Sequence, residues 1–441
     1  MQKRFAVLLL IFTLSHVTVL KGGVQRAQPA QSADISGHWV FSAVVQGEPV
    51  AGRLIFKVDG EKLTGTGDGL SLFGKLQEDK LEFVLWPQTA LPVATFKGTI
   101  ENGKLSGTVN LRGNPGTWTA QRPSNRPPDA PRFHNFEPKQ FHRLFSGTID
   151  PVLKIYPGDT VHTWSVDAGG IDHESVRRSR GGNPQTGPFY VEGAVPGDTL
   201  VVHLKRVRLN RDYAISGSSI AGSALTPNYL QSVKKVPNFD SKWKLDRERG
   251  VAMLANPTEK LKNYSVPLRP MLGCVGVAPL GRQAFGTGDL GPFGGNLDYN
   301  EVREGTILYL PVFQLGALLF MGDGHAAQGD GELTGDALET SMEIEFTVDV
   351  LQGKWVSGPR AENDEYLMVF GIGGSLHEAL QRATTGLGQW LESDYKLNSA
   401  ELAVVLGTSI RYDVAEIVDP HINVVAKIRK SVLAQLNKES K

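Results

Sequence analysis

Residues 307–332 read Ile-Leu-Tyr-Leu-Pro-Val-Phe-Gln-Leu-Gly-Ala-Leu-Leu-Phe-Met-Gly-Asp-Gly-His-Ala-Ala-Gln-Gly-Asp-Gly-Glu. The apolar part, 307–321, predicts a buried strand or core segment, and the rest is expected to emerge from it as a loop. This loop interleaves glycines with potential ligands, Asp323, His325, Asp330 and Glu332. Ordering so many glycines costs backbone entropy. Polar groups at the end of a rigid apolar scaffold are typical of binding and catalysis, so we expect a chemical role for the loop.

Composition limits the class of protein. The chain has 46 basic and 46 acidic residues, without the basic excess expected of a nucleic-acid binder or a membrane-surface protein. Fifty of the 441 residues are glycine, and helix-forming runs are rare before residue 375. These features predict a mainly β protein with many turns, and the length predicts two or three domains.

The N-terminus has the layout of a secretory signal peptide. Lys3 and Arg4 precede an apolar run that ends near Leu20, and small residues follow. We therefore expect residues 1–33 to be a signal peptide and the mature protein to be periplasmic or secreted, without a stable membrane span. A retained anchor is the alternative reading of the same run. The single cysteine, Cys274, cannot form an internal disulfide, and its apolar surroundings indicate a buried, inert thiol.

Residues 34–121 predict a small antiparallel β-barrel of lipocalin-like appearance. Short alternating strands are separated by Gly and charged turns, and the pairs 59–60 (Asp-Gly) and 102–103 (Asn-Gly) are strong hairpin signals. The segment 59–66 is echoed at 101–108. Trp39 and Trp118 would lie in the terminal strands and fill the core. Four prolines between residues 122 and 131 then predict a stiff linker, assigned to 122–140.

Residues 141–441 predict one larger domain. Strand patterns continue to residue 350, interrupted by an irregular excursion at 220–266 that should contain loops and a hairpin. Apolar residues at helical spacing between 376 and 391 predict an amphipathic helix. Asn398 and Glu401 form a capping-box pattern that predicts the start of a second helix. A third helix is predicted for Pro420–Leu436.

Three further clusters could contribute to chemistry. Asp167 ends a predicted strand before two glycines, and Glu192 lies in an apolar strand where an acid needs a partner or a metal. Asn296 and Asp298 would share a face if extended. Asp167, Asn296 and Asp298 are also typical turn residues. No Ser-His, Cys-His or standard zinc-protease spacing is present, so the residues indicate a metal-assisted or carboxylate-assisted hydrolase.

Several segments together resemble the acetamidase/formamidase family: 183–198, 273–279, 294–298, 310–332 and the Val-Asp-Pro-His motif at 418–421. The resemblance spans roughly residues 141–430. It implies a β-sandwich-rich fold and an amidase that acts on carbon–nitrogen bonds other than peptide bonds, in small linear amides of the formamide or acetamide type. The implied catalytic residues are Glu332, His325 and Asp167, and the implied metal ligands are His325, Asp167, Glu332, Asn296, Asp298, Asp323 and Asp330.

The expected reaction uses water activated by a divalent metal, zinc, with calcium as a candidate for a second site. The expected partners are a small amide and a second copy of the chain in a homodimer. Phe293 departs from the family pattern, which often has a histidine there, and the signal peptide and N-terminal domain are also unlike compact members. Two alternatives stay open: a non-catalytic, metal-stabilised secreted binding protein, and a hydrolase of another carbon–nitrogen bond.

Overall fold

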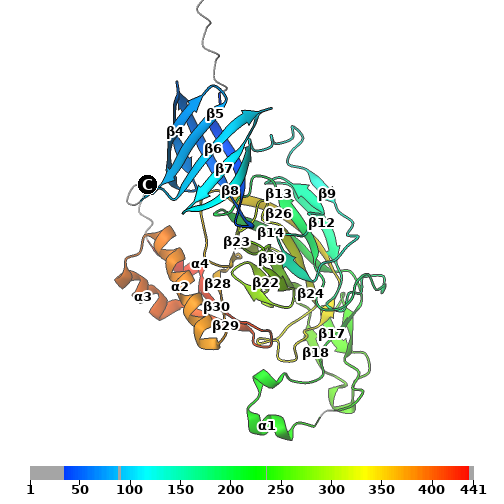
Figure 1. The fold of residues 1–441 in the computed structure, drawn as a ribbon. Helices are drawn as coiled ribbons and strands as arrows, with labels where there is room; N and C mark the ends of the chain where they lie inside the picture. The colour runs from blue at the N-terminus through cyan, green and yellow to red at the C-terminus, as the bar shows by residue number, and fades with distance from the viewer. Residues whose placement is uncertain (1–33, 88–90, 235, 437–441) are drawn as a thin grey trace, which may run out of the picture.

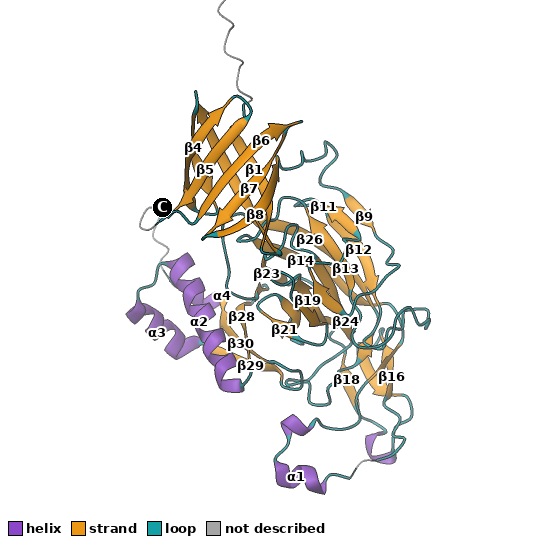
Figure 2. Cartoon of the chain, in the orientation of Figure 1, coloured by secondary structure: helices purple, strands orange, loops and turns teal. Residues whose placement is uncertain are grey.

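The computed structural model describes residues 34–87, 91–234 and 236–436, and these residues are mainly β. An N-terminal barrel adjoins a larger β domain that carries helices on one side (Figures 1 and 2). The predicted fold class is confirmed. The predicted signal peptide, residues 1–33, lies outside the described residues. No helix in the described part of the chain is long and apolar enough to cross a membrane.

The barrel is closed by eight antiparallel strands, and its last strand pairs with its first. The strands are β1 (Gly37–Val45), β2 (Glu48–Asp59), β3 (Lys62–Gly67), β4 (Leu70–Gln77), β5 (Lys80–Trp86), β6 (Ala94–Glu101), β7 (Lys104–Leu111) and β8 (Asn114–Gln121). Between β6 and β7, Asn102 and Gly103 have φ angles of 51° and 73°. A two-residue hairpin turn needs such positive angles, which Asn and Gly adopt most easily. The hairpin predicted at this position is confirmed.

Side chains fill the barrel. Trp39 and Trp118, on the paired strands β1 and β8, are 2% and 1% exposed. Their indole N–H groups donate to the carbonyls of Ile35 (2.8 Å) and Lys97 (3.1 Å), so neither buried polar group is left unsatisfied. Trp118 also meets the ring of Phe96 at right angles. The core role predicted for the two tryptophans is confirmed.

A buried ion pair joins the barrel to the larger domain. Arg53 of β2 donates to both carboxylate oxygens of Asp198, at 3.2 and 3.0 Å, and to the carbonyl of Gly193 at 3.1 Å. The two charged side chains are 14% and 1% exposed. Asp198 also accepts the backbone N–H groups of Val195 and Gly353. The larger domain therefore fixes the carboxylate, and the barrel supplies the opposite charge.

Arg53→Met is expected to lower the free energy of unfolding by about 2–3 kcal/mol, because it leaves the buried carboxylate of Asp198 without its cation. Lys97→Met is a matched control in the same barrel. Its ion pair with Glu82 is exposed, at 64% and 43%, and its loss should cost less than about 1 kcal/mol. Denaturant unfolding of both variants measures the difference. Equal stabilities would show that the backbone donors alone satisfy Asp198.

Two large sheets form the second domain. One has the order β18-β17-β16-β15-β25-β24-β19-β22-β21, with β13 beside β24 and β11 beside β13. The other has the order β29-β30-β28-β27-β23-β14-β26-β12-β9, and β10 and β20 form a separate pair. Strands β19 and β24 of the first sheet contact β12, β14, β23 and β26 of the second. The two sheets therefore enclose a common apolar core.

The strands of this domain have the following bounds. In the first sheet they are β11 (Leu153–Ile155), β13 (Thr186–Val191), β15 (Tyr213–Ile215), β16 (Lys242–Asp246), β17 (Val251–Leu254), β18 (Ser265–Pro267), β19 (Met271–Val277), β21 (Leu290–Gly291), β22 (Gly294–Asn296), β24 (Leu319–His325) and β25 (Glu339–Thr340). In the second they are β9 (Phe133–Asn135), β12 (Thr160–Ser165), β14 (Thr199–Leu209), β23 (Ile307–Pro311), β26 (Met342–Leu351), β27 (Arg360–Glu362), β28 (Tyr366–Gly373), β29 (Arg411–Glu416) and β30 (Ile422–Arg429). The separate pair is β10 (Leu144–Ser146) and β20 (Ala284–Gly286).

Two segments that were predicted as irregular contain some regular structure. Strand β9 falls inside the range 122–140 predicted as a linker and pairs in parallel with β12, so the end of that range belongs to a sheet edge. The excursion at 220–266 holds the hairpin β16–β17, as predicted. It also holds three short helices, η1 (Gly222–Ala224), α1 (Pro227–Ser232) and η2 (Glu259–Leu261).

The first two predicted C-terminal helices are confirmed. Helix α2 (Leu376–Tyr395) begins after Ser375, whose hydroxyl accepts the N–H of Glu378. It covers β28 and β30 (Figure 1). Helix α3 (Ser399–Ser409) begins with the predicted capping box, in which Asn398 and Glu401 each accept the other's backbone N–H.

The third predicted helix, 420–436, is wrong. Residues 422–429 form β30, which pairs with β28 on one side and β29 on the other, and only α4 (Lys430–Leu433) is helical. The segment contains the β-branched residues Ile422, Val424, Val425 and Ile428. Such side chains lose rotamer freedom in a helix and fit a pleated sheet. Pairing with β28 and β29 on its two sides therefore makes the segment a strand.

Candidate active site

The glycine-rich segment 322–332 was predicted as a loop, and this is wrong for its first four residues. Gly322–His325 completes β24, a strand in which every residue is buried. Strand β24 pairs with β19 on one side and with β13 and β25 on the other, and His325 lies opposite Glu339 of β25. The chain leaves the sheet only after His325. Asp323, the first acidic residue of the segment, is therefore buried within the sheet.

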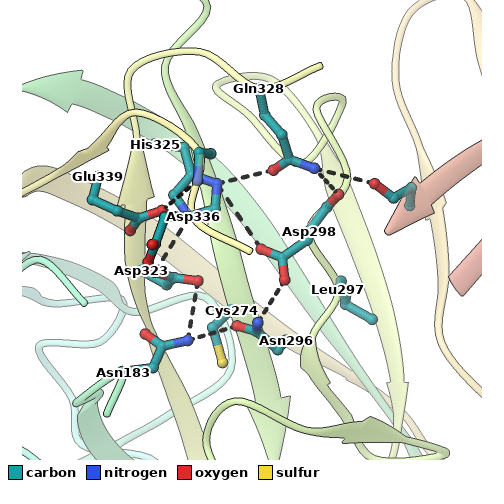
Figure 3. A network of polar contacts seen from close by, with 12 residues as sticks. Asn183, Cys274, Asn296, Leu297, Asp298, Asp323, His325, Gln328, Asp336 and Glu339 are labelled. Atoms are coloured by element: carbon teal, nitrogen blue, oxygen red, sulfur yellow. Dashed lines mark hydrogen bonds and ion pairs between the residues drawn. The ribbon is translucent and has the colours of Figure 1, made fainter. Parts of the chain in front are cut away.

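The imidazole of His325 is oriented by Gln328 (Figure 3). The Nε2 group of Gln328 donates to the carbonyls of Asp298 (2.5 Å) and Ala415 (3.2 Å). Its Oε1 is therefore left to accept from Nδ1–H of His325, at 2.9 Å. A hydrogen bond of this kind fixes the tautomer and leaves Nε2 free to bind a ligand.

Carboxylates converge on the free nitrogen of His325. Nε2 lies 3.1 Å from Oε1 of Glu339 and 3.3 Å from Oδ1 of Asp323, but the geometry makes no hydrogen bond to either. Oδ1 of Asp298 lies 3.9 Å from Nδ1 on the other side of the ring. In each of two sets of three side chains, one ligand atom per residue lies within 4.8 Å of the other two. The first set is Asp298, Asp323 and His325, and the second is His325, Glu332 and Glu339.

Two asparagines hold the carboxylates in place (Figure 3). The amide N–H₂ of Asn183 donates to Oδ1 of Asn296 at 2.7 Å and to Oδ2 of Asp323 at 3.0 Å. The amide N–H₂ of Asn296 donates in turn to Asp298 at 2.5 Å and to Asp419 at 2.8 Å. Asn296 was predicted as a metal ligand, and the structure uses its amide as a bridge between acids.

Four residues of this cluster adopt backbone angles that non-glycine residues rarely take. The φ angles of Asn183, Asp298, Asp323 and Glu332 are 57°, 41°, 58° and 46°. Left-handed conformations of this kind cost free energy, and they persist where the surrounding structure enforces them. Their concentration around one histidine indicates that the fold holds these side chains in a demanding arrangement.

Burial makes the ionised acids costly. It raises the pKa of Glu332 to about 9 and that of Glu339 to about 7. Burial, together with the charges of Glu332 and Asp323, raises the pKa of Asp298 well above its usual range. Burial lowers the pKa of His325, but the charges of Glu339 and Asp323 overcome this and raise it well above its ordinary value. One imidazolium cannot balance so many carboxylates.

The donor set fits a divalent cation. Oδ1 of Asp298, Oε2 of Glu339 and Nε2 of His325 are buried and have no hydrogen-bond partner among the described residues. Buried polar atoms are normally satisfied, so three such atoms in one cluster point to a missing partner. A histidine nitrogen with several carboxylate oxygens is a donor set that divalent metals accept.

The structure brings together only some of the predicted site residues. Asp298, Asp323, His325 and Glu332 lie in the cluster, whereas Asp330 is exposed and accepts a hydrogen bond from Asn300 at 3.1 Å. Asp330 was predicted as a ligand, and the structure places it outside the cluster. The alternation of glycine with acidic residues suggested a common wall, but the chain turns outward before Asp330.

Two other predicted acids have protein partners. The carboxylate of Asp167 pairs with the buried Arg211 at 2.6 Å and also accepts the N–H of Ile171. Asp167, predicted as a metal ligand, lines the same cleft but belongs to neither set of converging ligand atoms. Glu192 pairs with Lys154 at 3.2 Å near the barrel, so its partner is a lysine.

Sequence reasoning missed four contributors: Asn183, Gln328, Glu339 and Asp419. Glu339 reaches the site because β25 pairs with β24, a contact between segments that no local pattern specifies. Asp419 lies in the Val-Asp-Pro-His motif, which was noted in the sequence, and burial raises its pKa to about 7. Gln328 lies within the glycine-rich segment, but an amide carries no sequence signal for its role, which is to orient His325.

The carboxylates of Asp323 and Asp298 pack directly against Gly273 of β19. A Cβ atom at this position would lie 2.4 Å from Oδ2 of Asp323 and 2.5 Å from Oδ1 of Asp298. Gly273→Ala should therefore displace both carboxylates and abolish high-affinity binding of a divalent cation, which calorimetric titration can measure. Gly288→Ala is the matched control, since Gly288 lines the cleft and has open space at its Cβ position. Equal cation affinities in the two variants would contradict the assigned geometry.

The cluster opens into a cleft of about 840 Å³. Its lining includes Asp323, Glu332 and Glu339 of the cluster, together with Asp167 and Asn183. The cleft therefore connects the buried acids with solvent. This arrangement can bind a small polar molecule against a charged inner wall.

Comparison with known proteins finds one family that part of this chain resembles. Residues 289–419 match the model of the Acetamidase/Formamidase family. The resemblance to the acetamidase/formamidase family is confirmed. The structure of an acetamidase from Yersinia enterocolitica is 29% identical with a TM-score of 0.59, and the match covers 70% of this chain and 95% of that one. An acetamidase from Bacillus halodurans is 25% identical with a TM-score of 0.57, covering 69% and 99%.

Two curated relatives carry acetamidase/formamidase names. A putative formamidase of Schizosaccharomyces pombe is 27% identical over 34% of this chain and 47% of its own length. An acetamidase of Mycolicibacterium smegmatis is 27% identical over 38% of this chain and 53% of its own length. The chain thus spans about half the length of the curated relatives it matches.

Phe293, the noted departure from the acetamidase/formamidase pattern, belongs to the core. It is 2% exposed and lies between the rings of Phe145 and Phe285. It is also absent from the lining of the cleft. Phe293 therefore contributes aromatic packing to the core.

Proposed function

We propose that the protein hydrolyses a small linear amide to a carboxylate and ammonia with the help of a divalent cation. The observation that carries this proposal is that the carboxylates of Asp323 and Glu339, which line the inner wall of an open cleft, converge on the free Nε2 of the buried His325. The family match and the acetamidase structures support amide hydrolysis as the reaction class.

The residues that would hold the cation are His325, Asp323, Asp298 and Glu339, with Glu332 beside them. The mixed nitrogen and oxygen donors favour zinc. When bound, such an ion polarises a carbonyl group and lowers the pKa of water. The surrounding amides of Asn183 and Asn296 keep the carboxylates in position for it.

Two acids of the chain have further roles in the proposed reaction. Glu332 is buried, lines the cleft and has a raised pKa, so it can carry a proton and deliver it to the departing amine. The carboxylate of Asp167 is held rigidly by Arg211 and by the N–H of Ile171. It can therefore act as a fixed acceptor for an N–H of the substrate amide.

Ammonia release from a panel of short amides, measured with the purified protein, tests the proposal. Turnover of formamide, acetamide or a longer linear amide is expected, and turnover of nitriles or cyclic amides alone would assign another carbon–nitrogen bond. The rival function is a non-catalytic protein in which the same acids hold a structural Ca²⁺ ion. Tight calcium binding without ammonia release from any amide would favour that rival.

A further inference from the structure

The mouth of the cleft carries charge of the opposite sign to its inner wall. Asp323, Glu332 and Glu339 at the inner wall are 3%, 7% and 7% exposed. Arg143 and Arg177 line the same cleft but are exposed. The cleft therefore runs from buried carboxylates to exposed guanidinium groups.

Both arginines are held toward the cleft by the backbone of one loop, residues 167–183. Nη1 of Arg177 donates to the carbonyl of Gly169 at 2.5 Å, and Nη1 of Arg143 donates to that of Gly181 at 3.5 Å. Gly169 and Gly181 also line the cleft. A guanidinium group has five N–H donors in a planar fork, so most donors of each arginine remain available.

Neither Arg143 nor Arg177 has an acidic partner in the described part of the chain. Neighbouring arginines differ in this respect. Arg178 pairs with Asp172 at 2.5 Å, and Arg211 pairs with Asp167 at 2.6 Å. Acids of the loop therefore neutralise Arg178 and Arg211, whereas Arg143 and Arg177 remain as two cations at the mouth of the cleft.

The acids of the cleft are placed where they cannot neutralise these cations. Asp167 is already paired with Arg211. Asp336, an exposed acid of the lining, lies beside Asp323 and His325 (Figure 3). The guanidinium groups of Arg143 and Arg177 are therefore available to bind an anion from solution or an anionic group of a substrate.

The size of the cleft also exceeds the needs of formamide or acetamide. Its volume of about 840 Å³ is in the range that encloses drug-sized ligands. A molecule that spans it would contact both the inner wall and the mouth. The two exposed apolar side chains of the lining, Leu144 and Ile215, could cover a short methylene chain between them.

We propose that the substrate is a linear primary amide whose far end carries a carboxylate, which Arg143 and Arg177 bind while the amide group faces His325. The inference rests on the proposed amide hydrolysis and names its substrate class. Guanidinium groups bind carboxylates through paired, charge-assisted hydrogen bonds. The two arginines at the mouth therefore fix the direction in which the substrate enters.

The test compares kcat/KM for monoamides of dicarboxylic acids, namely malonamate, succinamate and glutaramate, with that for uncharged amides of equal chain length. The best monoamide is expected to exceed its uncharged counterpart by about tenfold or more. The variant R143Q/R177Q should lose this preference and keep its kcat/KM for the uncharged amide within about twofold. R180Q is the matched control, because Arg180 lies exposed in the same loop and does not line the cleft.

The outcomes separate this inference from the proposed function. Equal kcat/KM for charged and uncharged amides in the wild-type protein, or an unchanged preference in R143Q/R177Q, would overturn the inference while amide hydrolysis stands. Absence of ammonia from every amide would overturn both. Competitive inhibition by succinate that disappears in R143Q/R177Q, with R180Q inhibited as in wild type, is the second expected result and does not depend on which monoamide is turned over fastest.

Discussion

Glu332→Gln is expected to lower kcat for amide hydrolysis by about 10²–10⁴-fold, the usual contribution of a positioned acid–base group. Gln has almost the same volume as Glu but cannot take up and release a proton at ordinary pH. Glu332 is 7% exposed and lines the cleft, and burial raises its pKa to about 9. Steady-state kinetics on the fastest amide of the panel measures the effect.

Asp330→Asn provides the matched control for Glu332→Gln. It makes the same kind of change two residues away, at an exposed side chain whose partner is Asn300. Its kcat should stay within about twofold of wild type, and both variants should unfold at the wild-type temperature within a few degrees. Similar kcat values for the two variants would remove Glu332 from the reaction.

Removal of divalent cations with a chelator is expected to abolish amide hydrolysis and to lower the melting temperature, more at pH 9 than at pH 6. The sign follows from the raised pKa values of about 9 for Glu332 and about 7 for Glu339. An acid with a raised pKa in the folded state stabilises the fold below its unfolded pKa, near 4.3. That contribution is lost as the pH rises through the folded value.

The protein with a bound cation should behave differently, because the ionised carboxylates are then its ligands. The gap in unfolding free energy between the two forms should widen by a few kcal/mol between pH 6 and pH 9. Calorimetry at both pH values, with metal content measured by mass spectrometry, gives the comparison. Melting temperatures that are independent of chelator at both pH values would contradict a cation at this cluster.

Local chemistry made much of the fold predictable. The capping box at Asn398 and the Asn102–Gly103 turn are specified by residues a few positions apart, and both occur as predicted. Strand β30 depends instead on its pairing with two other strands, β28 and β29, which its own sequence does not specify. Its sequence allows a helical reading when it is considered alone, and the sheet overrides that reading.

The same distinction applies to the site. Asp323 and His325 could be predicted because they lie in one segment with an unusual composition. Glu339 could not, since its place opposite His325 follows from the register of β24 and β25. Asp330 illustrates the opposite limit: the composition of the segment groups it with His325, but composition does not say where the chain turns outward.

Cys274, the single cysteine of the chain, offers a built-in probe of how often this site opens. It lies on β19 opposite Asn296 and Gly322, fully buried, and its thiol contacts the carbonyl of Thr287. Burial raises the pKa of this thiol well above its usual value. A thiol reagent can modify it only when β19 separates from its neighbours, so the rate of labelling reports how often the site unfolds locally. A ligand that binds the closed form is expected to lower this rate.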